Sequence, residues 1–346
     1  MDRVTVVIVT HDGADEIQEC LECLVGNGAG SPHVVVVDNA SSDGTPELVK
    51  SGSPAVELIV LPENYGYGFG ANIGSERSSR EFIAFLNQDA RASPSWLEAS
   101  IAALEENPSA AFVTPKILIR QNPARINTCG NTIHVTGITT CRGYDQSAVS
   151  FAQREFVIGM SGAALVGRKS AFRRLGGFDE SFFMYYEDTD LSLRGALAGF
   201  KCLYEPEAVV THSFEPSFSA QKLYVLERNR YASLFKVLRV PTLLLLGPVL
   251  VLAELAVWGY CVSRGPGLVA SKFKAWIWLA GHVREISNAR HAVQELRKAG
   301  DRELLAGMTG SLDLSELGSP LATICVRPLN LLFRMWRALV RVVVFW

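Results

Sequence analysis

The residues best suited to chemistry lie in one stretch, where aromatic and apolar side chains run directly into carboxylates. Phe182–Tyr186 form the apolar part. Glu187, Asp188 and Asp190 follow, and a helix-compatible pattern of leucines begins after them. Because neighbouring carboxylates repel one another and apolar groups exclude water, the pKa of at least one should be raised. Such a carboxyl group in a cleft can act as general base toward a hydroxyl group. The alternative is structural, since acidic residues in the first turn of a helix are stabilised by the helix dipole.

Two more aspartates each follow directly after a predicted strand. Asp38 follows a run of four valines, and Asp89 closes Asn87-Gln-Asp89 after another apolar run. In sheets whose strands alternate with helices, ligands bind beyond the carboxyl ends of the strands. The shared position of these two aspartates therefore predicts a ligand site at that edge.

His212 ends a third apolar run, at 208–212. A lone histidine in such a place is more often structural than functional. With two carboxylate sites already in view, it becomes a candidate third metal ligand. Hard oxygen ligands suit Mg²⁺ or Mn²⁺, so a divalent cation is the predicted cofactor.

The elements that must position these residues alternate between strands and helices. Short, continuous, β-branched runs are typical of a parallel sheet, and their alternation with helices predicts a doubly wound α/β fold. We expect residues 115–155, which show no regular pattern, to form acceptor-side loops. The strands are predicted at 4–9, 34–37, 56–61, 81–86 and 111–114, with helices near 15–24, from residue 45, and at 94–107.

A glycine-rich segment opens an alternative in another functional class. Gly66–Ala71 fits the pattern GxGxxA, and Asp89 follows at about the spacing of a dinucleotide-binding fingerprint, so a nicotinamide-dependent oxidoreductase is a live hypothesis. Against it, residues 62–65 separate the preceding strand from the first glycine, whereas the fingerprint needs that glycine at the strand end. We interpret 62–74 as a glycine-rich loop and short helix beside the site.

Composition bounds the remaining classes. The chain has 346 residues and a net charge of −2, which argues against a general nucleic-acid binder. Its seven scattered cysteines argue against a disulfide framework and for a reducing compartment. Cys20 and Cys23 are interpreted as apolar helix positions, with zinc a minor alternative. The apolar run 4–9 is too short for a secretory signal peptide.

The last hundred residues differ in kind from the rest. Residues 242–262 are almost all apolar, broken by Glu254 and Gly247-Pro248, and are long enough to span a membrane. A buried core helix and a re-entrant or interfacial hairpin are the alternatives. Residues 282–303 predict a charged, cytosolic helix. Residues 324–346 gather four arginines on one helical face and apolar residues on the other, which predicts an in-plane amphipathic membrane helix.

Six motifs, taken together and in order, resemble family 2 glycosyltransferases of the GT-A fold, particularly the bacterial rhamnosyltransferase-like branch. The resemblance covers roughly residues 3–215. The motifs are Val6–Thr10, Val37–Thr45, Glu63–Gly66, Asn87–Asp89, Gly176–Asp179 and Tyr186–Leu191.

The resemblance implies roles for particular residues. Asp38 would contact the nucleotide of a sugar donor, and Asp89 would bind the metal with His212 as a further contact. Asp188 would be the catalytic base. The other motif residues would bind the donor (Thr10, Asp12, Asn64, Gly66 and Asn87) or support the acceptor side (Tyr186, Glu187 and Asp190). Departures from the family pattern are Asp12 after the first strand, Gln88 in the metal motif and Ile73.

The resemblance also implies an activity and partners. We expect an inverting, metal-dependent transfer of a sugar, with rhamnose a candidate, from a nucleotide-sugar donor to a polyprenyl-diphosphate-linked glycan in cell-surface polysaccharide synthesis. Residues 1–235 would form the GT-A catalytic domain, divided at about 115/116 into nucleotide-sugar and acceptor halves. Residues 236–346 would attach it to the cytoplasmic face of the cell membrane. Association into a homo-oligomer is left open.

Overall fold

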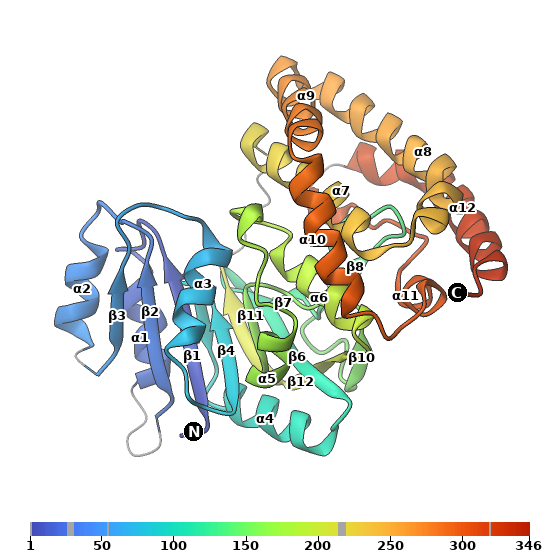
Figure 1. Ribbon diagram of the computed structural model, residues 1–346. Helices are drawn as coiled ribbons and strands as arrows, with labels where there is room; N and C mark the ends of the chain where they lie inside the picture. The colour runs from blue at the N-terminus through green and yellow to red at the C-terminus, as the bar shows by residue number, and fades with distance from the viewer. Residues whose placement is uncertain (1, 26–30, 54, 214–218, 318–319) are drawn as a thin grey trace. The chain divides into compact units, whose positions relative to one another are not determined.

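In the computed structural model of the chain (Figure 1), the valine-rich run near the N-terminus forms β1 (Val4–Thr10). Every residue of this strand is buried. Its parallel neighbours are β2 (His33–Asp38) and β4 (Phe82–Leu86), and β3 (Glu57–Val60) extends the sheet beyond β2. Continuous apolar strands buried on both faces are what a parallel sheet requires. In this register Thr10 pairs with Asp38, so the loops after β1 and β2 leave from the same edge.

Helices cover both faces of this sheet. Residues of α1 (Ile17–Val25), α2 (Thr45–Gly52) and α4 (Trp96–Glu106) join one core with Val4, Val6 and Ile8 of β1. The opposite face carries α3 (Tyr67–Glu76), where a Cβ on Gly74 would lie 2.4 Å from Val7. On that face α5 (Lys169–Arg174) also packs, with the rings of Phe172 and Phe85 5.0 Å apart. The predicted doubly wound α/β architecture is confirmed.

Strand direction changes beyond β4. There β11 (Ala164–Arg168) lies antiparallel between β4 and β6 (Ala110–Ile119), and β12 (Lys201–His212) runs parallel to β6. The short β5 (Ala90–Ala92), just after the predicted metal motif, pairs antiparallel with β12 and sets His212 opposite Ala90.

The prediction that 115–155 is irregular was wrong in part. β6 continues to Ile119, and β7 (Asn122–Thr128) pairs with it. The first four residues of β7 are exposed, so they carry no apolar pattern that could have announced a strand. Three shorter strands follow: β8 (Asn131–Ile133), β9 (Thr139–Cys141) and β10 (Glu155–Val157).

The structure describes residues 2–25, 31–53, 55–213, 219–317 and 320–346, and these divide into two compact units. The first unit holds the ten-stranded sheet. The second combines residues 132–140 and 192–199 with the C-terminal part of the chain, so the division falls within α6 (Glu187–Leu197). The predicted domain ranges stay a prediction. Most of α7 (Ala220–Val237) precedes their boundary at 235, but α7 belongs to the helical unit.

The second unit is helical. The predicted apolar helix is present as α8 (Val240–Arg264), which continues through Pro248 and is long and apolar enough to cross a membrane. The predicted charged helix 282–303 is divided by residues 296–300. The remaining elements are α9 (Pro266–Gly281), α10 (Val283–Glu295), α11 (Asp301–Gly307) and α12 (Pro320–Val343), with one-turn 3₁₀ helices at Glu180–Phe182 in the first unit and Ser315–Leu317.

Candidate functional site

Asp38 organises the loop that follows β2. Its carboxylate is fully buried and accepts hydrogen bonds from the backbone N–H of Ser41 at 3.0 Å and from the Ser41 hydroxyl at 2.5 Å. Hydrogen bonds to both oxygens stabilise a buried carboxylate and fix the turn. In this structure Asp38 therefore shapes the loop that would meet a nucleotide.

The loop after β1 is tied to two neighbouring loops. Asp12 adopts a positive φ of 45° and accepts a hydrogen bond from the N–H of Ser42 at 2.8 Å. The N–H of His11 donates to the side chain of Gln88 at 3.0 Å. Gln88, a departure from the family pattern, is thus a contact between the metal motif and the β1 loop that sequence reasoning missed. Beside them, the hydroxyl oxygen of Thr10 is buried and has no hydrogen-bond partner among the described residues.

Gly66 joins the glycine-rich loop to the acidic motif. Its N–H donates to Asn64 Oδ1 at 2.9 Å, its φ is +89°, and a Cβ here would lie 2.2 Å from the carbonyl oxygen of Phe183. The next N–H, of Tyr67, donates to that same oxygen at 2.6 Å. The glycine therefore permits a close approach of two backbones. Because β3 ends at Val60, six residues before Gly66, this glycine is not the strand-end glycine of a dinucleotide fingerprint.

Asp89 and His212 lie side by side, as the metal prediction requires. His212 Nε2 is 3.4 Å from Asp89 Oδ2, and both side chains retain some exposure. The other ring nitrogen, Nδ1, lies 3.2 Å from Asn127 Oδ1. A second hydrogen bond of this kind orients a metal-binding imidazole and directs Nε2 toward the carboxylate. Asn127 lies within the segment predicted to be irregular and was not foreseen.

The stretch before the acidic motif has an unusual backbone. Phe183, Tyr185 and Tyr186 all have positive φ values, of 65°, 59° and 76°. Such conformations in bulky residues cost of order 1–3 kcal/mol each and persist only where the surrounding structure enforces them. They turn the chain so that α6 begins at Glu187 and its first turn carries the three carboxylates. The two interpretations of the motif, acidic residues in the first turn of a helix and a cluster of carboxyl groups beside apolar residues, therefore both hold for the same residues.

Asp188 is anchored to a strand-side loop. Its Oδ2 accepts hydrogen bonds from the N–H of Gly162 at 2.8 Å and from Asn131 Nδ2 at 3.3 Å. Its Oδ1 accepts from the N–H of Thr189 at 2.6 Å. Burial raises the pKa of Asp188, while the backbone donors of Gly162 and Thr189 oppose that shift. The carboxyl group is thus held in one orientation with enhanced basicity.

Glu187 lies beside Asp188 with a different environment. It is buried, and its Oε2 has no hydrogen-bond partner among the described residues. Burial, and secondarily the charge of Asp188, raise the pKa of Glu187 to about 8. A Cβ on Gly162 would lie 3.4 Å from Asp188 Oδ2 and 3.5 Å from Glu187 Oε1, so Gly162 lies directly beside both carboxyl groups. Asp190, fully buried, follows in the same turn.

Residues 162–163 connect the two predicted centres. Gly162 donates to Asp188, and the carbonyl oxygen of Ala163 accepts from the N–H of Asn87 at 2.9 Å. The hydroxyl of Tyr67 donates to the carbonyl of Gly162 at 3.4 Å. The predicted base and the metal motif therefore flank one two-residue segment. No motif in the sequence marked this segment, which lies in an apolar run that also contains Gly159 and Ser161.

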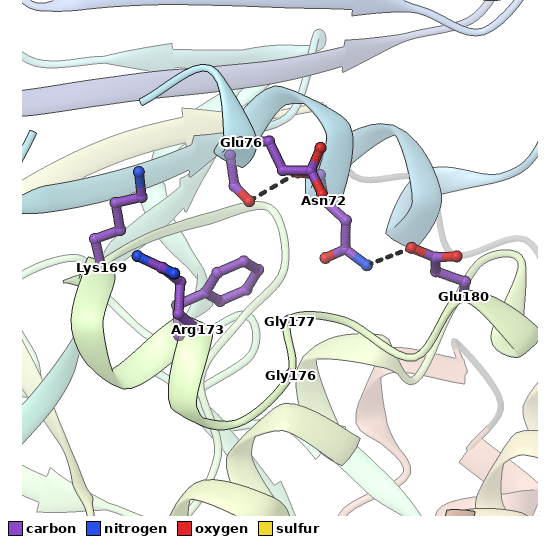
Figure 2. A pocket seen from close by; sticks show the side chains of 9 residues that line it. Asn72, Glu76, Lys169, Arg173, Gly176, Gly177 and Glu180 are labelled. Atoms are coloured by element: carbon purple, nitrogen blue, oxygen red, sulfur yellow. Dashed lines mark hydrogen bonds between the residues drawn. The ribbon is translucent and has the colours of Figure 1, made fainter. Parts of the chain in front are cut away.

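One pocket of the first unit lies elsewhere. It has a volume of about 530 Å³ and is lined by Asn72, Lys169, Arg173 and Glu180 among others (Figure 2). The backbone N–H of Lys169 donates to the backbone carbonyl of Glu81, just before β4 begins, whereas Asp89 follows the other end of that strand. The pocket therefore lies toward the end of β4 opposite Asp89. None of the predicted site residues lines it. Among the described residues, no three His, Cys, Asp or Glu side chains gather into a metal site, and the six cysteines with described side chains form no disulfide bonds.

Comparison with known proteins gives a consistent picture. The family model described as Glycosyl transferase family 2 matches residues 5–176. The N-acetylglucosaminyl-diphospho-decaprenol L-rhamnosyltransferase of Mycobacterium tuberculosis is 30% identical over 236 residues, covering 61% of this chain and 76% of that protein.

Two solved structures are similar in fold. The mannosyltransferase PcManGT from Pyrobaculum calidifontis, in complex with GDP-Man and Mn²⁺, aligns with a TM-score of 0.50 and 17% identity, covering 99% of this chain and 86% of its own. GalNAc-T7 with UDP, GalNAc and Mn²⁺ gives a TM-score of 0.52 and 14% identity, covering 67% of this chain and 47% of its own.

Proposed function

We propose that this chain, which belongs to glycosyltransferase family 2, transfers a sugar from a nucleotide-sugar donor to a polyprenyl-diphosphate-linked acceptor. The observation that carries the proposal is the shared segment at residues 162–163, which joins Asp188 to the strand end that carries Asp89. The lipid-linked acceptor, and rhamnose as the sugar, are suggested by the name of the mycobacterial relative. The oxidoreductase alternative is set aside, since Gly66 lies six residues beyond the end of β3 and not at the strand end that a dinucleotide fingerprint needs.

Asp89 and His212 fit a divalent cation. Two neighbouring ligands of an octahedral Mg²⁺ or Mn²⁺ lie about 3 Å apart, given metal–ligand distances near 2.1 Å. The 3.4 Å between His212 Nε2 and Asp89 Oδ2 is close to that separation. Such ions often take one or two protein ligands and complete their shell with substrate phosphates and water. When bound, the cation would neutralise charge that develops on the diphosphate.

Asp188 is the proposed base. Its fixed carboxylate would take the proton from an acceptor hydroxyl as that oxygen attacks the anomeric carbon and the nucleoside diphosphate leaves. Glu187, with a pKa of about 8, would be protonated at neutral pH and would leave a single negative charge on the pair. With Asp188 as the base and the acceptor oxygen as the attacking atom, the transfer would be a single displacement with inversion.

Attachment to the cytoplasmic face of a membrane would place the enzyme beside such an acceptor. The C-terminal region carries α8 and the amphipathic α12, whose Leu332, Met335 and Leu339 are exposed. Arg337, one of the four arginines on the predicted basic face of 324–346, donates to backbone oxygens of Leu305 and Ala306 and is thus engaged within the helical unit.

The experiment is a donor screen with purified full-length protein. A panel of sugar nucleotides, including a rhamnose donor, is incubated with polyprenyl-diphosphate-linked N-acetylglucosamine and Mn²⁺ or Mg²⁺. We expect one donor to give a sugar-extended lipid with inverted anomeric configuration, and chelator to stop the reaction. Failure of every sugar nucleotide to bind, react or protect the protein from thermal unfolding would contradict the proposal.

A further inference from the structure

The apolar helix α8 has one acidic side chain, Glu254, near its centre, and that side chain is fully engaged within the helical unit. Glu254 accepts hydrogen bonds from the hydroxyl of Tyr231 at 2.5 Å and from Trp276 Nε1 at 2.9 Å. Lys272 Nζ lies 2.8 Å from the same carboxylate. These partners come from α7 and α9, so Glu254 connects three helices.

Lys272 is fully buried and is shared between two carboxylates. It pairs with Glu227 as well as Glu254, and Glu227 in turn pairs with Arg230 through two bonds of 2.9 and 2.8 Å. Two carboxylates and two cations make the group electrically neutral. Breaking such a group by removing one member is strongly unfavourable, because an unpaired charge stays buried.

The geometry of α8 and α9 is a hairpin. The helices are separated by Gly265 alone, Trp258 contacts Phe273 with ring centres 4.9 Å apart, and Glu254 contacts Trp276. The earlier residue of α8, Glu254, meets the later residue of α9, Trp276, so the two helices run antiparallel. A helix that crossed a bilayer here would draw Glu254 away from α7, whose Glu227, Arg228 and Arg230 make it unsuited to hydrocarbon.

The outer surface of α8 is apolar along its length. Leu244, Val251, Leu255 and Val262 follow one another at spacings of seven, four and seven, which places them on one face. They are 74%, 60%, 63% and 68% exposed. The opposite face is the buried one. Exposed apolar residues also mark α9 and α12: Phe273, Ile277, Met335, Leu339 and Val342.

The charges on these helices favour an anionic partner. Glu254 is the one acidic residue in the described parts of α8, α9 and α12, and it is already paired with Lys272. Four basic side chains are exposed: Arg264, Lys274, Arg327 and Arg334. Apolar faces flanked by basic residues match the boundary between acyl chains and anionic headgroups.

We propose that α8 does not cross the membrane and that the α8–α9 hairpin lies in the plane of an anionic bilayer surface. The stripe Leu244, Val251, Leu255 and Val262 enters the acyl boundary, and both ends of α8 stay on one side. The inference rests on the proposed membrane association and decides its form.

The first test is topological. Val240→Cys and Ser263→Cys mark the two ends of α8, both at exposed positions. Each variant is expressed in full length, and sealed vesicles of uniform orientation are treated with a membrane-impermeant maleimide before and after detergent. Labelling is read peptide by peptide by mass spectrometry, so native cysteines do not interfere. We expect equal labelling of the two ends before detergent. Labelling of only one end would show a spanning helix and overturn the proposal.

The second test concerns the outer stripe. Val251→Gln/Leu255→Gln is compared with Val60→Gln/Val149→Gln, which changes two exposed apolar residues of the first unit in the same way. We expect the first pair, and not the second, to lower co-sedimentation with vesicles of 30% anionic lipid at least threefold. An equal decrease in co-sedimentation for both pairs would contradict the proposal. A parent protein that forms dimers through this stripe and does not bind vesicles would also contradict it. Transfer to a water-soluble acceptor analogue should survive in the Val251/Leu255 variant, so loss of binding here leaves the proposed glycosyl transfer intact.

Discussion

At the scale of single residues, Asp89 is expected to govern the metal dependence. Asp89→Ala removes the carboxylate beside His212 Nε2 and leaves the imidazole alone. We expect Mn²⁺ to raise the unfolding temperature of the parent in the presence of donor and to have little effect on the variant. Glu98→Ala, which removes an exposed carboxylate of α4, serves as the control. Full Mn²⁺-dependent protection in Asp89→Ala would exclude Asp89 as a ligand.

Asp188 and Glu187 are adjacent carboxyl groups whose environments give them separate roles. Asp188→Asn keeps the size of the side chain and removes its basicity. We expect transfer to fall by about 10²–10⁴, the usual contribution of general-base catalysis, with donor affinity within a few-fold of the parent. Glu187→Gln should retain far more activity, because Glu187 is expected to be protonated already. The opposite ranking, measured as kcat for both variants, would identify Glu187 as the base.

The raised pKa of Glu187 also predicts how stability depends on pH. Its pKa is about 8 when folded, against an ordinary value of 4.5. Between these values the folded chain binds a proton that the unfolded chain has released, so the free energy of unfolding falls as pH rises through this range. Because glutamine does not titrate, Glu187→Gln removes this pH-dependent decrease in the free energy of unfolding. The unfolding temperature of the variant, relative to the parent, should therefore be higher at pH 8 than at pH 5, and a difference that is constant with pH would refute the buried, protonated state.

At the scale of elements, the glycine-rich loop before α3 depends on one backbone conformation. Gly66 has φ 89° and ψ 171°, a combination that is essentially restricted to glycine and costs other residues of order 1–3 kcal/mol. A Cβ would also overlap the carbonyl of Phe183, 2.2 Å away. Gly265 is a matched control, since its φ of 115° and ψ of 174° lie in the same region but nothing lies within 4 Å of the added atom.

We therefore expect Gly66→Ala to destabilise the chain more than Gly265→Ala. It should also reduce transfer, because the displaced Phe183 leads directly into Glu187 and Asp188. Chemical unfolding gives the first comparison and steady-state kinetics the second. Equal losses in the two variants would mean that backbone conformation alone, and not contact with the acidic motif, explains the glycine.

At the scale of the whole molecule, the division at residue 235 has a consequence for truncation. Ending the chain after Val237 keeps Glu227 and Arg230 of α7 but removes Lys272 and Glu254. The Glu227–Arg230 pair is kept, but α9 and α10, which pack along α7, are lost, so side chains of α7 that are buried in the full chain would meet water. We expect this fragment to aggregate or to unfold at a much lower temperature than the full chain. A soluble fragment with the unfolding temperature of the parent would show that α7 does not need its helical neighbours.

The sequence by itself determined the α/β architecture, the strand ends that carry Asp38 and Asp89, and the start of α6 at the acidic motif. These follow from local signals: continuous β-branched runs, turn residues after them, and carboxylates before a leucine pattern. Only the tertiary structure decided that Asn127 orients His212, that Gly162 holds Asp188, and that Glu187 differs from its neighbour. Those contacts join residues that are 85 and 26 positions apart, so their geometry depends on strand register rather than on local pattern. The partners of Glu254 were hidden for the same reason, because the hydropathy of α8 is local whereas the charges that hold it come from two other helices.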